Sequence, residues 1–209
     1  MRRFLPVLLF FLALLVSCDF KYEAPRPPTW GDQCQPSDPY YLELAQGTQF
    51  LSKKGEVSSD PKEALDSALE YIEGKGVDLE YKADGIEAWS RFNTTFPKTI
   101  YLVKDFESRP LRNRAEVLWH EVVHLRQYEK MTPSTFYQHY VFAEGRWALE
   151  VQAYRESFRV MRILGYDEAA IQTLMRSRAE SLYDGYELVQ MPRECAVGAA
   201  IEIWNADRR

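Results

Sequence analysis

The sequence of 209 residues contains few histidines and cysteines, three of each, and has no excess of positive charge. Its net charge of -5 argues against a nucleic-acid-binding surface, because such surfaces are basic. The longest apolar run, residues 4–16, is too short for a transmembrane helix, and no internal repeat is apparent. Hydrophobic (46%) and charged (27%) fractions are ordinary for a globular protein, so this length predicts one domain with its own core.

The first residues have the build of an export signal, because Arg2 and Arg3 precede the apolar run. Residues 15–18, Leu-Val-Ser-Cys, resemble the lipobox of bacterial lipoproteins. The resemblance implies that Cys18 is lipidated and anchors the protein at the cell envelope, facing the periplasm or the exterior. An ordinary secretory signal or an uncleaved anchor is the alternative. We expect a signal at residues 1–18, a proline-rich tether at 19–39 and a folded domain at 40–209.

The other two cysteines form an even pair in a chain that we expect to be exported. Cys34 and Cys195 are therefore predicted to form a disulfide between the amino-terminal arm and the carboxy-terminal segment.

The pattern of the folded part predicts an α+β domain, mostly helical, with a small sheet. A helix is expected over residues 40–51, with Asp38 as its N-cap, and another from Pro61 to Gly74 or Gly76, with Asp60 as N-cap and Glu63 completing a capping box. Strands are expected at residues 77–81 and 99–103, with a loop or irregular strand at 91–97. Further helices are predicted at residues 111–129, 136–141, 146–164, 167–183 and 192–205, with an interruption at Gly145.

The most informative motif is His120-Glu121-Val122-Val123-His124, which reads His-Glu-x-x-His. Ala115, Leu118, Val122 and Leu125 continue a helical stripe that begins at Leu111, and this stripe faces the core. The two histidines lie one turn apart on a neighbouring face, where both imidazoles can reach one metal ion. An ordinary amphipathic helix with hydrogen-bonded histidines is the alternative.

A zinc site on this motif needs a third protein ligand and leaves the fourth position for water. Only His139 remains as a histidine, so a carboxylate is more economical, and Glu144, Glu150 and Glu156 are the candidates. Glu150 is the best placed, because Ala143 and Ala153 share its helical face. Small neighbours would allow a close approach to the histidine helix.

These residues resemble the gluzincin zinc metallopeptidases, which have a second glutamate ligand on a downstream helix, often followed three residues later by Ala, as Glu150 is by Ala153. The resemblance implies a zincin-like fold in which residues 99–103 form the edge strand that pairs with extended peptide substrates. It also implies Zn²⁺ held by His120, His124 and Glu150, which lowers the pKa of a bound water to about 7. Glu121 would be the general base.

Two features of the resemblance stay open. Many gluzincins have Asp four residues after the ligand glutamate, where it holds a ligand histidine, and this chain has Tyr154 there. A different group must therefore orient the imidazoles. The oxyanion also needs a donor besides zinc, and Arg146, Tyr154 and His139 are the candidates.

Two functions follow. The first is a lipid-anchored zinc peptidase that cuts protein or peptide substrates at the cell envelope. The second is a non-catalytic lipoprotein that keeps the zincin architecture as a binding or structural module, which the replacement of Asp by Tyr154 favours.

Overall fold

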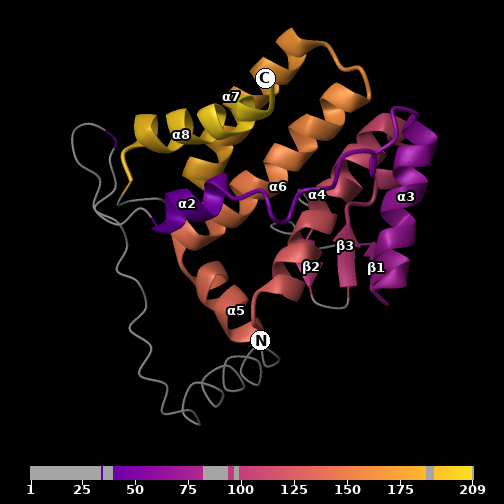
Figure 1. Cartoon of the computed structure of the whole chain (residues 1–209), viewed down its shortest axis with the longest axis horizontal. Coiled ribbons are helices and arrows are strands. Elements are labelled where there is room, and N and C mark those ends of the chain that lie inside the picture. Colours follow the sequence, from indigo (N-terminus) through magenta and orange to yellow (C-terminus); the bar gives the residue numbers. More distant parts are fainter. Residues whose placement is uncertain (1–33, 35–39, 82–93, 97–98, 187–190, 209) are drawn as a thin grey trace, which may run out of the picture.

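The computed structural model describes residue 34 and residues 40–81, 94–96, 99–186 and 191–208. Helices dominate this part of the chain, which also contains one small sheet, as expected for the predicted α+β class (Figure 1). The predicted signal and, apart from Cys34, the predicted tether lie outside the described residues, so lipidation of Cys18 stays a prediction. None of the described helices is both long enough and apolar enough to cross a membrane.

The described α-helices are α2 (Tyr40–Gln46), α3 (Pro61–Gly74), α4 (Leu111–Lys130), α5 (Pro133–Val141), α6 (Ala143–Ile163), α7 (Glu168–Tyr186) and α8 (Arg193–Asn205). Two short 3-10 helices, η1 (Phe106–Ser108) and η2 (Ala206–Arg208), precede α4 and end the described chain. The strands are β1 (Asp78–Tyr81), β2 (Thr94–Phe96) and β3 (Thr99–Leu102).

The sheet has the strand order β1-β3-β2. β3 runs parallel to β1, with Leu79 opposite Ile100, and antiparallel to β2, with Thr95 opposite Ile100. The strand predicted as the substrate-pairing edge, residues 99–103, is therefore the central strand, and this prediction was wrong. The segment expected to be a loop or irregular strand contains β2, which pairs with β3 and lies at the edge of the described sheet. Pairing uses backbone hydrogen bonds, which the turn-forming residues of this segment do not prevent.

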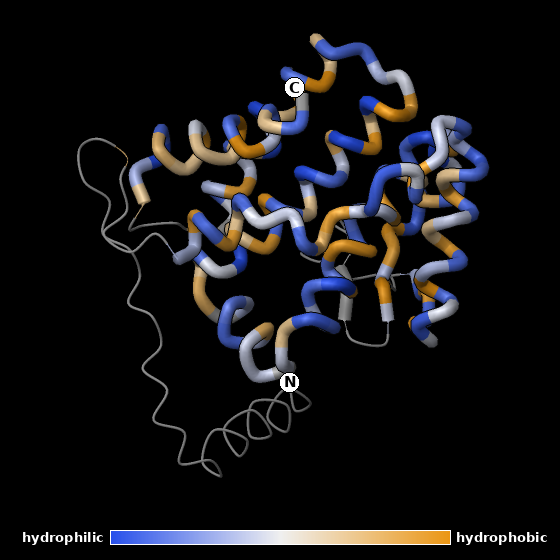
Figure 2. Tube along the Cα trace, in the orientation of Figure 1, coloured by the Kyte–Doolittle hydropathy of each residue, from blue (hydrophilic) through white to orange (hydrophobic). Residues whose placement is uncertain are grey.

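Two hydrophobic clusters lie on either side of α6, which runs through the middle of the molecule (Figure 1). One cluster joins α2, α6, α7 and α8 around Trp147, Phe158 and Trp204. The other joins α3, the sheet and α4, and Val160 of α6 contributes to it. Figure 2 shows hydrophobic and hydrophilic residues alternating along α3 and α6, the pattern of helices that bury one face.

The start of α3 follows the predicted capping signals. Asp60 accepts hydrogen bonds from the Lys62 and Glu63 amides, and Pro61 is the first residue of α3. Glu63 does not close the predicted capping box, because its carboxylate accepts from Ser58 Oγ and the Asp60 amide donates to that same hydroxyl. The helix predicted over residues 40–51 already ends at Gln46, and its predicted N-cap lies outside the described residues.

The predicted interruption at Gly145 was wrong, because the break between α5 and α6 falls at Phe142, whose backbone is extended (φ -87°, ψ 139°). Gly145 lies inside the first turn of α6 and serves a different purpose. A Cβ there would come within 2.1 Å of the His139 carbonyl oxygen. Glycine therefore allows α5 to cross closely over the start of α6.

Cys34 and Cys195 form a disulfide, as predicted, with a Cα–Cα distance of 5.1 Å. It connects the segment before α2 to the first turn of α8 across 161 residues of sequence. The bond fastens Cys34 to α8. A cross-link that closes so long a loop also restricts the unfolded chain strongly.

Candidate metal centre

α4 carries both motif histidines and is fixed by its apolar stripe. Ala115, Leu118 and Val122 are fully buried against α3 and the sheet, and Leu125 is nearly so. Leu111, which begins the stripe, is exposed because it is the first residue of the helix. With this face buried, His120 and His124 project from the neighbouring face, and each imidazole is 12% exposed.

α6 brings Glu150 to these histidines. Ala153 is completely buried and packs with Val123 of α4 and Phe50, as the prediction of a small residue at the crossing requires. Ala143 does not take part in this crossing, because it packs against the cluster around α2 and α8. Hydrogen bonding fixes the approach as well, since the Gln127 amide of α4 donates to the Leu149 carbonyl at 3.0 Å.

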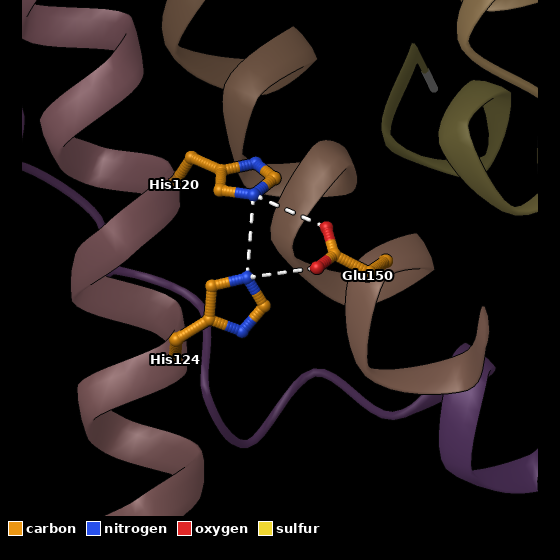
Figure 3. Close-up of side chains that lie close together, drawn as sticks. All are labelled: His120, His124 and Glu150. Carbon is orange, nitrogen blue, oxygen red and sulfur yellow. Dashed lines mark hydrogen bonds and ion pairs between the residues drawn. The ribbon is translucent and has the colours of Figure 1, made fainter. Parts of the chain in front are cut away.

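The three predicted metal ligands meet at one point between α4 and α6 (Figure 3). His120 Nε2 and His124 Nε2 are 3.3 Å apart, and Glu150 places one carboxylate oxygen 3.4 Å from the first and the other 3.6 Å from the second. Ligand atoms arranged tetrahedrally around zinc, with bonds of about 2.0–2.1 Å, are about 3.3–3.4 Å apart. Each Nε2 atom faces a different oxygen of Glu150, and these separations are compatible with one metal ion held by two imidazoles and one carboxylate.

The electrostatics of the cluster are those of a strongly coupled ion pair. Burial of His124 opposes its protonation, but the Glu150 carboxylate attracts and hydrogen-bonds the imidazolium and raises the pKa of His124 to about 9. Burial likewise acts on Glu150, and His124 and His120 outweigh it, so the pKa of this carboxyl lies well below its ordinary value. At neutral pH the negative Glu150 carboxylate thus faces the imidazole nitrogens of His120 and His124. A proton on His124 occupies the position that a metal ion would take.

The outward nitrogen of His124 is held by an amide whose orientation is determined by its neighbours. Gln127 Nε2 donates to the Leu149 carbonyl and, at 2.8 Å, to Gln152 Oε1. Gln127 Oε1 must therefore face His124, and it lies 2.9 Å from Nδ1. An amide oxygen only accepts, so Nδ1 carries a proton and Nε2 is the nitrogen available to a metal.

His120 is held by a hydroxyl and an aromatic ring. Its Nδ1 lies 3.3 Å from Ser157 Oγ, and Ser157 also hydrogen-bonds the Glu116 carboxyl one turn before His120 on α4. Burial raises the pKa of Glu116 despite this hydrogen bond. The Tyr154 ring packs edge-on against the His120 ring, with centroids 4.6 Å apart.

Glu121, the predicted general base, is buried on α4, with 3% of its surface exposed. Its carboxylate is close enough to His124 to contribute to the rise in the pKa of that imidazole. A carboxylate buried beside the ligand cluster can take a proton from a water molecule there, as a general base requires.

The structure separates the remaining candidates. Glu156 is fully buried away from the cluster, where Ser52 Oγ donates to it and Arg159 Nε lies 3.1 Å from it. Glu144 is also buried and does not belong to the ligand cluster. Glu150 is thus the carboxylate brought to the histidines, as predicted.

The three candidate oxyanion donors also differ. His139 is buried between α5 and α2, and its Nε2 is already hydrogen-bonded to the Tyr40 hydroxyl at 2.9 Å. Arg146 donates to the Tyr140 carbonyl at 2.9 Å. Tyr154 is the candidate that touches a ligand histidine, and burial, followed by the Glu150 carboxylate, raises the pKa of its phenol well above the ordinary value.

Sequence reasoning missed the groups that orient the imidazoles: Glu116, Gln127 and Ser157. Gln127 lies three residues after His124 and Glu116 four residues before His120, so helical spacing places both beside the histidines. Ser157 lies seven residues after Glu150, two turns along the same face of α6. The sequence contains these spacings, but it gives no signal that distinguishes Glu116, Gln127 and Ser157 from the many other polar residues of both helices.

No family model, no curated protein and no solved structure matches this chain.

Proposed function

We propose that the protein is a zinc-dependent peptidase in which His120, His124 and Glu150 hold the metal ion and Glu121 is the general base. The observation that carries the proposal is the clustering of the donor atoms: the two Nε2 atoms are 3.3 Å apart, and each lies 3.4 or 3.6 Å from one oxygen of Glu150. The Nδ1 atoms of both imidazoles also have dedicated partners. A zinc ion bound there would act as a Lewis acid and make water a nucleophile at neutral pH.

The residues of the chain supply the remaining steps. Glu121 takes a proton from water as the water attacks the substrate carbonyl, and it returns this proton to the departing amine. Gln127 keeps Nδ1 of His124 protonated, so that its Nε2 lone pair points toward the ligand cluster, and Ser157 holds Nδ1 of His120 from behind. The Tyr154 phenol, protonated at neutral pH and next to His120, is the donor that we propose for the oxyanion.

An extended peptide substrate would pair with β2, which is an edge strand of the described sheet and packs near α4. Such pairing uses the backbone groups of the strand and holds the peptide next to the histidine helix. Residues 94–96 would thus have the role that the sequence suggested for residues 99–103. Substrate pairing by an edge strand is part of the zincin-like fold that we propose.

The decisive experiment combines metal analysis with one substitution. The purified full-length protein should contain one zinc per chain and cleave peptides of a broad library, and chelation should stop cleavage. Glu121→Gln should retain the zinc and lose cleavage by about 100-fold or more, the range of general-base catalysis. Glu129→Gln, an exposed position on the same helix, is the matched control and should cleave normally.

Absence of stoichiometric zinc would contradict the proposal. Zinc without cleavage in the unmodified protein would instead favour a non-catalytic zincin-like module. We also propose that a lipid on Cys18 holds the domain at the cell envelope, and loss of acyl labelling and of membrane association in Cys18→Ala tests this separately.

A further inference from the structure

One arginine near the metal centre differs from its neighbours. Arg178 lies on the exposed side of α7, and within the described residues its guanidinium has no hydrogen bond or ion pair. Six other arginines, one just before α4 and five within α4 and α6, form ion pairs with carboxylates: Arg109, Arg114, Arg126, Arg155, Arg159 and Arg162. An arginine left unpaired beside a candidate active site is available to a ligand.

The position of Arg178 relates it directly to the ligand histidines. Its Cζ atom lies 5.7 Å from the centroid of the Tyr154 ring, and that ring lies 4.6 Å from the ring of His120. The guanidinium is therefore within about 10 Å of the His120 ring. An extended chain advances about 3.3–3.6 Å per residue, so this distance corresponds to no more than about three residues of a bound peptide.

A carboxylate that attracts Arg178 is already engaged. Glu116 attracts Arg178 electrostatically, but its carboxyl is hydrogen-bonded to Ser157, and no ion pair within 4 Å joins it to Arg178 among the described residues. The cation–π contact with Tyr154 positions the guanidinium without using its N–H donors. These donors form a planar fork that matches a carboxylate.

We infer that Arg178 binds a carboxylate of the peptide substrate within about three residues of the bond at the metal centre. The carboxylate belongs either to the carboxyl terminus of the peptide or to an Asp or Glu side chain. The inference rests on the proposed peptidase function and narrows its substrate class to peptides that are acidic on one side of the scissile bond.

The test measures binding, so it does not depend on turnover. Full-length Glu121→Gln protein is equilibrated with a pool of N-acetylated pentapeptides prepared in four forms: as free acids or as C-terminal amides, and with Asp or with Asn at one internal position. Mass spectrometry after equilibrium dialysis gives the bound fraction of each peptide. Carboxylate-bearing forms should bind about tenfold more tightly than their neutral counterparts, a difference of about 1.4 kcal/mol.

Substitutions assign this preference to one residue. Arg178→Gln, combined with Glu121→Gln, should remove the preference, and Arg178→Lys should keep part of it. Arg176→Gln removes the same charge from an exposed position of α7 and should leave the preference intact. Zinc content and circular dichroism should be the same for all variants, because Arg178 is exposed and forms no hydrogen bond to the three proposed ligands.

Each outcome decides a separate point. A preference abolished by the amide identifies the carboxyl terminus, and one abolished by Asn identifies an acidic side chain. Equal binding of all four forms, or a preference that persists in Arg178→Gln, would overturn the inference even if the unmodified protein cleaves peptides. A preference that depends on Arg178 in a protein without cleavage would keep the carboxylate site and reject the peptidase.

Discussion

The two proposed ligand histidines are equivalent toward Glu150 but differ in what holds them from behind. His124 is backed by Gln127, whose amide is fixed by two further hydrogen bonds to α6, both of them buried. His120 is backed by a single hydroxyl at the longer distance of 3.3 Å and by the packing of one aromatic ring. The region around His124 is therefore a rigid amide network, whereas that around His120 depends on packing.

This difference has a physical consequence for the metal centre. The Gln127 network also joins α4 to α6, because Gln152 donates onward to the Leu44 carbonyl before the loop that follows α2. Orientation of His124 is thereby coupled to the stability of the helix pair. Orientation of His120 is coupled instead to Glu116 and Tyr154, which lie toward Arg178 and the proposed substrate site.

The largest expected effect comes from removing a ligand, and here the two histidines should behave alike. His120→Ala, His124→Ala and Glu150→Gln should each lose stoichiometric zinc, because three protein ligands are the minimum for such a centre. Metal content after dialysis against a weak chelator measures this. His139→Asn is the control, since His139 bonds to Tyr40 and not to the cluster, and it should retain zinc.

Retention of zinc by any one of the three ligand variants would show that the cluster is not the metal site. Loss of zinc in His139→Asn would mean that the substitution unfolds the junction of α2 and α5, which circular dichroism would detect. A difference in residual zinc affinity between His120→Ala and His124→Ala would indicate that the surroundings of the two imidazoles contribute to zinc binding.

The next effect should separate the two histidines. Gln127→Leu should lower zinc affinity by about 10- to 100-fold, because His124 loses its orienting acceptor. It should also lower the free energy of unfolding by about 1–3 kcal/mol, since the Leu149 carbonyl and Gln152 Oε1 lose a buried donor. Ser157→Ala should lower affinity only by about tenfold, as the Tyr154 ring still packs against His120. Chelator competition and chemical denaturation measure the two quantities.

Matched controls lie on α7. Gln172 is half-buried and, like Gln127, donates to two partners, Glu168 and Asn205, so Gln172→Leu should reduce stability without changing zinc affinity. Ser181→Ala removes an exposed hydroxyl and should change neither. A larger loss of affinity in Ser157→Ala than in Gln127→Leu would reverse the comparison of the two histidines.

Much of the fold could be predicted from local signals. Asp60 and Pro61 at the start of α3, and Thr132 and Pro133 at the start of α5, act through contacts within a few residues, so the sequence contains them directly. The order of the strands could not be predicted in this way. That β3 lies between β1 and β2 depends on pairing across distant segments, which the pattern of residues 94–103 does not specify.

The candidate site divides in the same manner. His120 and His124 are one turn apart on one helix, so their approach follows from spacing alone. Glu150 required a second helix, and the small residue Ala153 gave the correct indication, while Ala143 gave a wrong one. Ser157 reaches His120 only through the crossing of α4 and α6, whose angle no local pattern determines.

The smallest expected effect on zinc affinity concerns Tyr154, where the ring and the hydroxyl have different roles. Tyr154→Phe keeps the ring against His120 and should change zinc affinity by less than about threefold. Tyr154→Ala removes the ring contact, worth about 0.5–1.5 kcal/mol for an aromatic pair, and should lower affinity by about 2- to 12-fold. Chelator competition resolves the two variants.

Turnover by Tyr154→Phe then tests the hydroxyl alone. If the phenol stabilises the oxyanion, kcat should fall by about 100-fold or more while zinc content stays complete, because one donor is lost only in the transition state. Unchanged kcat would remove Tyr154 from the catalytic groups and leave its ring as the support of His120. A tenfold loss of zinc affinity in Tyr154→Phe would contradict the packing role, since it would mean that the hydroxyl and not the ring keeps His120 in place.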